Sequence, residues 1–120
     1  MSMDKLISDV KGLAKQEYGR ASAKFGETNN SDHESYAVLL EELEEAMVEV
    51  NEFQWQIDKF WELVKSNDDD LRKYSRLLEM ERRAAMAAAE LVQVVAMVMK
   101  ATATVCARGE VKPNENIHRN

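Results

Sequence analysis

The sequence predicts an all-α fold, an antiparallel helical bundle with two long helices whose core is completed by oligomerisation. Helix-forming residues dominate, and the chain contains one Pro and four Gly, too few to punctuate a strand-and-turn architecture. Apolar residues also recur every three or four positions over long stretches. At 120 residues we expect one helical domain over 1–108. The polar segment 109–120 is predicted to be a flexible tail.

The first helix is expected over about residues 4–25. Its apolar side chains share one stripe at spacings of three and four, although Gly12 and Gly19 weaken the helix. A turn over 26–30 follows. The stripe consists of Leu6, Ile7, Val10, Leu13, Ala14, Tyr18, Ala21 and Phe25.

The second helix is expected over 32–65. Ser31 and Glu34 have the spacing of a capping box, in which each side chain accepts a hydrogen bond from the other's backbone N–H. The apolar stripe that follows would be roughly 50 Å long at 1.5 Å per residue. A single chain of this size can hardly bury it, so a second copy is expected, in a homodimer or homotetramer. The stripe consists of Tyr36, Leu39, Leu43, Ala46, Val50, Phe53, Ile57, Phe60 and Val64.

The third helix is expected over 71–107, after a turn whose aspartates cap it. Its segment from Ala84 to Met99 is apolar on nearly all sides, which predicts a position at the centre of the bundle. Because Glu90 and Gln93 interrupt this segment, and because it is shorter than the ~20 residues of a membrane span, we interpret it as a core helix. Gly109 is a natural stop.

Charge and composition narrow the function classes. The net charge is −6 and the pI is about 5.0, so a nucleic-acid duplex has no net attraction to the protein. Cys106 is the single cysteine and cannot form an intrachain disulfide. With neither a signal peptide nor a membrane span expected, the predicted location is the cytoplasm.

Carboxylates on two helices are the candidate chemistry. Glu42, Glu45 and Glu49 share one flank of the second helix, which is either a metal-binding edge or an ordinary solvated acidic face. Glu90 has apolar helical neighbours, and burial of an unpaired carboxylate costs several kcal/mol. We therefore expect Glu90 to meet either a metal ion or an Arg or Lys of another helix. Gln93 lies one turn further along the same face.

Two motifs carry a resemblance to a known family. The sequence EELEE over 41–45 and the sequence ELVQ over 90–93 resemble the EExxE and ExxD hallmarks of the MazG-like all-α nucleoside triphosphate pyrophosphohydrolases. The likeness is greatest to short phage and prophage members and covers roughly residues 30 to 103. Gln93 stands in place of the family's Asp.

The resemblance implies an enzyme that converts a nucleoside triphosphate to a nucleoside monophosphate and pyrophosphate. Glu42, Glu45 and Glu90 would be its catalytic residues and would hold Mg²⁺ or Mn²⁺ through hard oxygen ligands. The location would be a bacterial host cytosol if the gene is phage-borne.

Further residues are candidates for nucleotide binding. Arg83 and Lys100 flank the Glu90 segment and would reach the phosphates, with Gln93 assisting, while Trp55 and Trp61 offer surfaces for a base. Surface ion pairs and core packing are the ordinary roles of such residues. The alternative function is a non-catalytic, phage-associated helical interaction protein whose metal site has degenerated at Gln93.

Overall fold

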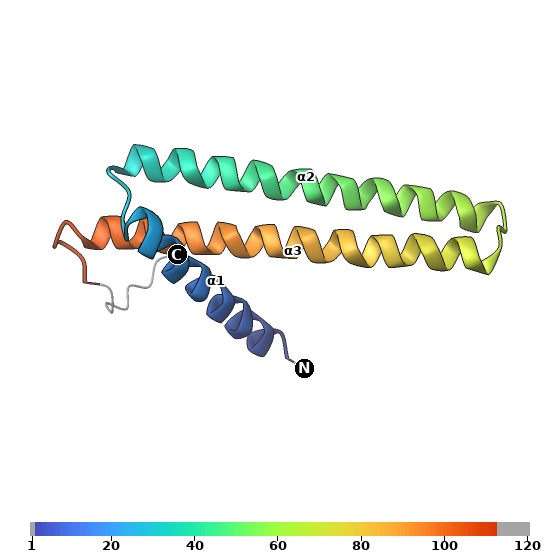
Figure 1. The fold of residues 1–120 in the computed structure, drawn as a ribbon, viewed down its shortest axis with the longest axis horizontal. Helices are drawn as coiled ribbons and strands as arrows, with labels where there is room; N and C mark the ends of the chain where they lie inside the picture. The colour runs from blue at the N-terminus through green and yellow to red at the C-terminus, as the bar shows by residue number, and fades with distance from the viewer. Residues whose placement is uncertain (1, 113–120) are drawn as a thin grey trace. The chain divides into compact units, whose positions relative to one another are not determined.

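The computed structural model describes residues 2–112, which form three α-helices and no strand (Figure 1). These are α1 (Met3–Phe25), α2 (Asp32–Lys65) and α3 (Asp70–Cys106). The all-α class is confirmed over this range, and each helix end lies within one residue of its expected position. The predicted tail lies outside the described residues from position 113 onward.

Local capping explains where α1 begins and ends. The Ser2 side chain accepts a hydrogen bond from the Lys5 backbone N–H at 3.2 Å, which satisfies one of the unpaired donors of the first turn. Gly26 has a φ of 94° and donates its backbone N–H to the Ser22 carbonyl at 2.9 Å. Glycine adopts this positive φ without steric cost, so the helix ends there.

The start of α2 differs in detail from the expected capping box. Ser31 Oγ accepts from the Glu34 backbone N–H at 3.1 Å, as predicted. The Glu34 carboxylate, however, accepts from the backbone N–H of Asn30 at 3.0 Å rather than from that of Ser31. The Glu34 side chain thereby pairs the backbone N–H of the residue before Ser31, and the helix still begins at Asp32.

The turn between α2 and α3 is a Schellman motif, with Asn67 in the left-handed region at a φ of 51°. The Asp68 N–H donates to the Leu63 carbonyl at 3.0 Å and the Asn67 N–H to the Val64 carbonyl at 3.1 Å, which pairs the last carbonyls of α2. Asp69 then caps α3, because its carboxylate accepts from the Arg72 N–H at 2.8 Å.

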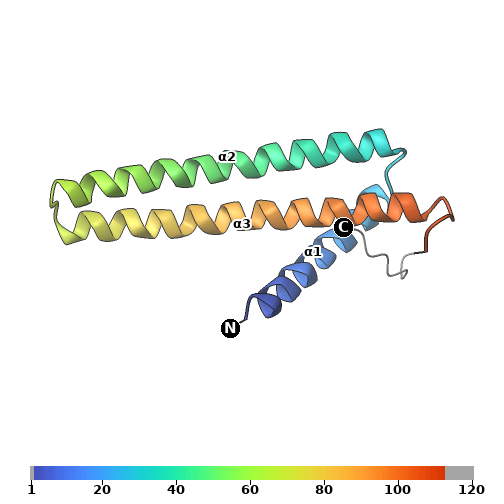
Figure 2. The same cartoon turned by 180° about the vertical axis from the view of Figure 1, so that it is seen from behind.

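The described residues divide into two compact units, one formed by 2–41 with 92–112 and the other by 42–91. We call them unit 1 and unit 2. Unit 2 is a helical hairpin in which the second part of α2 and the first part of α3 run antiparallel (Figure 2). Unit 1 contains α1, the start of α2 and the end of α3.

Unit 1 is joined by a polar network. Asn29 is 8% exposed. Its backbone N–H donates to Thr104 Oγ1 at 2.8 Å, and its side-chain amide donates to Ser35 Oγ at 2.8 Å. Arg108 and Asp32 pair at 3.0 Å. These bonds link the segment after α1 to the ends of α2 and α3 that belong to this unit.

The apolar core of the described chain is small. Its buried apolar residues are Ala14, Ala46, Ala87 and Ala96, and no large side chain among the described residues is fully buried. The expectation that the segment from 84 to 99 is buried is not met within one chain, where Ala84, Ala85, Ala88 and Ala89 are exposed. The physical reason is that a two-helix hairpin covers only one side of each helix.

One window of 18 residues within α3 is long and apolar enough to cross a membrane by length and composition, and 11% of it is buried in the structure. Core helices of soluble proteins, which are mostly buried, and signal sequences meet the same criterion. Cytoplasmic location therefore stays a prediction.

Candidate metal centre

The two helices of unit 2 meet along a heptad seam. Its members are spaced alternately by three and four residues and are buried or half-buried, the spacing that keeps a helix in contact with an antiparallel neighbour. We call this set the hairpin seam. On α2 it consists of Glu42, Ala46, Glu49, Phe53, Gln56, Phe60 and Leu63, and on α3 of Lys73, Arg76, Met80, Arg83, Ala87 and Glu90.

Polar layers interrupt the hairpin seam at intervals of seven residues. Nearest the turn, Arg76 Nη1 donates to Gln56 Oε1 at 2.7 Å. One heptad further from the turn, Arg83 Nη1 lies 3.7 Å from Glu49 Oε2. That carboxylate oxygen is buried and has no hydrogen-bond partner within the described chain, so the charge of Arg83 is its principal compensation.

The third polar layer, one heptad further again, brings carboxylates together from both helices. Glu42 and Glu45 of α2 and Glu90 of α3 each offer an oxygen atom, and these atoms all lie within 4.8 Å of one another. Glu42 and Glu90 are half-buried, whereas Glu45 is exposed. We call these three residues the acidic cluster. They are the three residues that the resemblance to MazG-like enzymes implied as metal ligands, and the structure brings them together.

The chemistry of the acidic cluster is that of a hard-cation site. Carboxylate oxygens are the ligands that Mg²⁺ and Mn²⁺ prefer, and three like charges so close together repel unless a cation or protons neutralise them. The donor set therefore fits a divalent ion. Exposed acidic groups also occur in proteins without an ion.

Glu49 does not join the acidic cluster, although it shares the same flank in the sequence pattern. It pairs instead with Arg83, which also donates from Nε to Glu79 at 3.0 Å. Arg83 is thus held between two carboxylates of unit 2, and its expected contact with phosphates stays a prediction.

Gln93 and Lys100 belong to unit 1. Gln93 Nε2 donates to Glu17 Oε2 at 2.9 Å. This bond, followed by one from Arg20, lowers the pKa of the Glu17 carboxyl below its ordinary value. The cations of Arg20 and Lys24 and the amide of Gln93 border a shallow pocket of about 310 Å³ here. Its lining consists of Glu17, Arg20, Ala21, Lys24, Phe25 and Gln93. Lys100 is half-buried.

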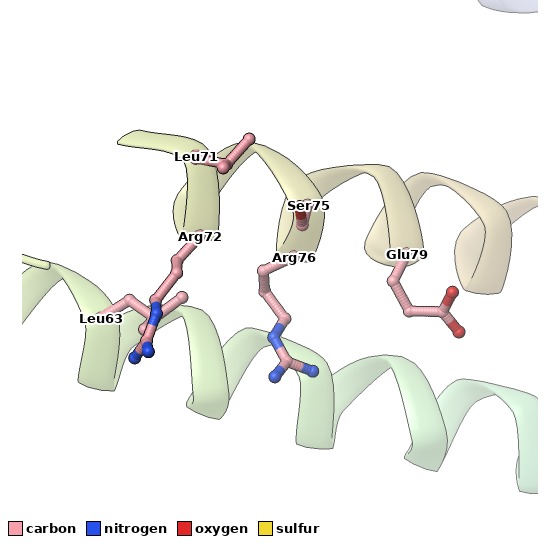
Figure 3. Close-up of a pocket in the computed structure, with 6 residues that line it drawn as sticks. All are labelled: Leu63, Leu71, Arg72, Ser75, Arg76 and Glu79. Carbon is pink, nitrogen blue, oxygen red and sulfur yellow. The ribbon is translucent and has the colours of Figure 1, made fainter. Parts of the chain in front are cut away.

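A second pocket, of about 500 Å³, lies beside the turn of unit 2, and Figure 3 shows Arg72 and Arg76 reaching across it from α3 toward α2. Both arginines already have partners, because Arg72 lies 3.5 Å from Asp68 and Arg76 donates to Gln56. The Arg76 guanidinium also lies 5.9 Å from the Trp55 ring centroid, within the range of cation–π attraction. Trp55, which is 49% exposed, thus lies beside a cation of α3 in this unit.

Among the polar contacts that sequence reasoning missed are that of Glu17 with Gln93 and that of Gln56 with Arg76. The second had a signal, because Glu42, Glu49 and Gln56 follow one another at intervals of seven and mark one side of α2 as a polar seam. The first joins residues far apart in the sequence, and no local pattern indicates it.

Comparisons with protein-family models, with curated proteins and with solved structures found no match for this chain. The resemblance to MazG-like enzymes consequently depends on the two motifs alone.

Proposed function

We propose that this protein binds a divalent cation, Mg²⁺ or Mn²⁺, at Glu42, Glu45 and Glu90, and with it hydrolyses a nucleoside triphosphate to a nucleoside monophosphate and pyrophosphate. The observation that carries the proposal is the approach of three carboxylate oxygens from two helices to within 4.8 Å. The resemblance of their two motifs to those of MazG-like enzymes supplies the reaction class.

The polar layers of the hairpin seam support a cation at this position. In the other two layers an arginine of α3 meets a glutamine or glutamate of α2. In the third layer the α3 position of the arginine is taken by Glu90, which lies beside Glu42 and Glu45 instead. A layer built from carboxylates on both helices gains stability from an ion supplied from solution.

Each residue of the acidic cluster has a distinct part in this proposal. Glu42 and Glu90 lie in the hairpin seam, so packing restricts their side chains, while the exposed Glu45 borders solvent, from which a metal–nucleotide complex arrives. The bound ion would neutralise triphosphate charge, polarise the α-phosphorus and activate water. A bond from water oxygen to the α-phosphorus forms as the bond to the β-phosphate oxygen breaks, with pyrophosphate as leaving group.

One observation favours the alternative, a non-catalytic interaction protein of phage origin. Gln93 stands where the family has its Asp, and its amide already donates to Glu17. A neutral amide adds no negative charge to a metal site. Under this alternative the acidic cluster binds a cation weakly or not at all, and pyrophosphate is not released.

The test is a titration of the full chain with Mn²⁺ and Mg²⁺ by calorimetry and thermal denaturation, with pyrophosphate release measured on a panel of nucleoside triphosphates. An ion that binds only the folded protein at 100 times its Kd stabilises it by about 2.7 kcal/mol. Glu90→Gln is expected to weaken Mn²⁺ binding at least tenfold and to abolish release.

The matched control is Glu44→Gln, which removes the same charge from the EExxE motif at an exposed position outside the acidic cluster. It should keep both binding and release. Equal Mn²⁺ affinity in the two variants overturns the site, and cation binding without pyrophosphate release from any nucleotide favours the alternative.

A further inference from the structure

Unit 2 has two unlike faces, defined by the residues on either side of the hairpin seam. Because its helices run in opposite directions, the residue after each seam position points to the same side of the hairpin on both helices, and the residue before it to the other side. We call the first set face A. It consists of Leu43, Met47, Val50, Gln54, Ile57, Trp61 and Val64 on α2, and Tyr74, Leu77, Glu81, Ala84, Ala88 and Leu91 on α3.

Face A is almost wholly apolar, with Glu81 its one charged residue and Gln54 its one amide. Eight of its large side chains are between 39% and 60% exposed. These are Leu43, Met47, Ile57, Trp61, Val64, Tyr74, Leu77 and Leu91. An exposed apolar set of this kind, continuous along two helices, is typical of an interface.

The opposite side, which we call face B, is strongly charged. Seven of its twelve residues are Glu, Lys or Arg. It consists of Glu45, Val48, Glu52, Trp55, Lys59 and Glu62 on α2, and Arg72, Ser75, Glu79, Arg82, Met86 and Ala89 on α3. Face B is therefore suited to water, and the contrast singles out face A as the side that needs cover.

We propose that face A pairs with face A of a second copy of this chain, so that two hairpins form a four-helix bundle. The apolar positions of face A repeat by three and four on both helices, and a second copy offers the same repeat, which allows knobs-into-holes packing between them. A symmetric pair uses one patch twice, so a single sequence suffices to make it self-complementary.

The area of face A matches what a stable dimer needs. About 33 Å of α2 and about 27 Å of α3, each about 10 Å wide, give roughly 600 Å² per copy and about 1,200 Å² in total, at the lower end of the range of roughly 1,200–2,000 Å² for stable interfaces. Pairing would also supply the core that unit 2 lacks, since its buried apolar residues are only Ala46 and Ala87.

Pairing through face A leaves the acidic cluster accessible. Glu45 belongs to face B and is exposed, so a second copy on the other side of the hairpin does not cover it. The proposed dimer is thus compatible with the proposed function and does not depend on it.

The first test measures the mass of the full chain in solution by light scattering and sedimentation. The wild type is expected to have at least twice the 13.7 kDa of one chain. Ile57→Glu, on face A, should halve that mass. Val48→Glu introduces the same charge on face B at a position that is 59% exposed, and it should leave the mass unchanged.

The second test does not depend on a destabilised variant, because the chain has one tryptophan on each face with similar exposure, 56% for Trp61 and 49% for Trp55. Trp55→Phe leaves Trp61 as the one tryptophan of the chain, and Trp61→Phe leaves Trp55. We expect Trp61 fluorescence to resist acrylamide quenching severalfold better than Trp55 fluorescence, and to lose this protection on dilution.

Three results overturn the proposal. The first is a wild-type mass of one chain at micromolar concentration, and the second is equal quenching of the two tryptophans. The third is a single-chain mass together with co-sedimentation on vesicles of phosphatidylcholine and phosphatidylglycerol, which would assign face A to a lipid surface instead.

Discussion

Arg76, Arg83 and Glu90 occupy three successive heptad positions on the same side of α3. The first two meet Gln56 and Glu49 of α2, and the third meets Glu42 and Glu45. The α3 residue of a layer is thus arginine where the layer is a structural pair and glutamate where the layer is a candidate cation site. The sequence showed the carboxylates, but only the pairing of the helices showed which of them meet an arginine.

The Glu49–Arg83 pair is expected to contribute to stability mainly by avoiding an uncompensated charge. Arg83→Leu leaves the buried Glu49 oxygen without its cation, and we expect a loss of about 2 kcal/mol in the free energy of unfolding, measured by urea denaturation. The double variant with Glu49→Leu should recover most of that loss.

The control for this cycle is Arg82→Leu, because Arg82 is exposed and lies 3.5 Å from Glu79. An exposed pair of this kind is worth under about 0.5 kcal/mol. Equal effects of Arg82→Leu and Arg83→Leu would contradict the assignment.

The bond between Gln93 and Glu17 predicts a pH dependence. Because the pKa of Glu17 is lowered in the folded chain, its ionised form contributes stability above the pKa of the unfolded state, and this contribution is lost as the pH falls through the folded pKa. Gln93→Leu should raise the Glu17 pKa toward its ordinary value, as measured by NMR titration. The variant should be less stable than the wild type at neutral pH and equal to it at low pH, whereas an unmoved pKa would assign the shift to Arg20.

At the scale of elements, caps and turn residues determine where the helices begin and end. Ser2, Ser31 and Asp69 each accept a backbone N–H in the first turn of a helix. Such contacts join residues within four positions along the chain, so the sequence indicates them directly. For this reason each helix end was predicted to within one residue. The Glu34 carboxylate accepts from the Asn30 N–H and not from the Ser31 N–H. This detail was not predicted, because spacing does not distinguish the two donors.

Substitutions at Asn67 test the conformation of the turn between α2 and α3. Its φ of 51° lies in the left-handed region, which costs a β-branched residue about 1–2 kcal/mol and costs glycine nothing. Asn67→Val should therefore lower the melting temperature, and Asn67→Gly should leave it unchanged or raise it slightly. A valine variant as stable as the wild type would indicate that the turn adopts another conformation.

At the scale of the whole molecule, the described chain buries alanines and leaves large apolar side chains exposed. The series of apolar positions along α2 that predicted its core, from Leu43 to Val64, divides between two sides of the helix. Ala46, Phe53 and Phe60 lie in the hairpin seam, while Leu43, Ile57 and Val64 are exposed on face A. The single stripe of the sequence is thus two neighbouring seams, of which one is used within the hairpin.

A protein that folds with its partner has a stability that depends on concentration. We expect the melting temperature of the wild type to rise by several degrees over a hundredfold increase in protein concentration, by mass action. Ile57→Glu should melt at a temperature independent of concentration. A wild-type melting temperature that does not change with concentration would mean that the folded chain needs no second copy.

The sequence by itself determined the fold class and the helix ends, because propensity, capping and heptad spacing act over a few residues along the chain. Spacing grouped Glu42 and Glu45 with Glu49, and it was the resemblance to MazG-like motifs that implied Glu90 as the third carboxylate. Only the tertiary structure decided that Glu49 meets Arg83, that Gln93 meets Glu17 and that Gln56 is buried. These contacts depend on the register between helices, and a one-position rotation of either helix would exchange a seam residue for a residue of face A or face B.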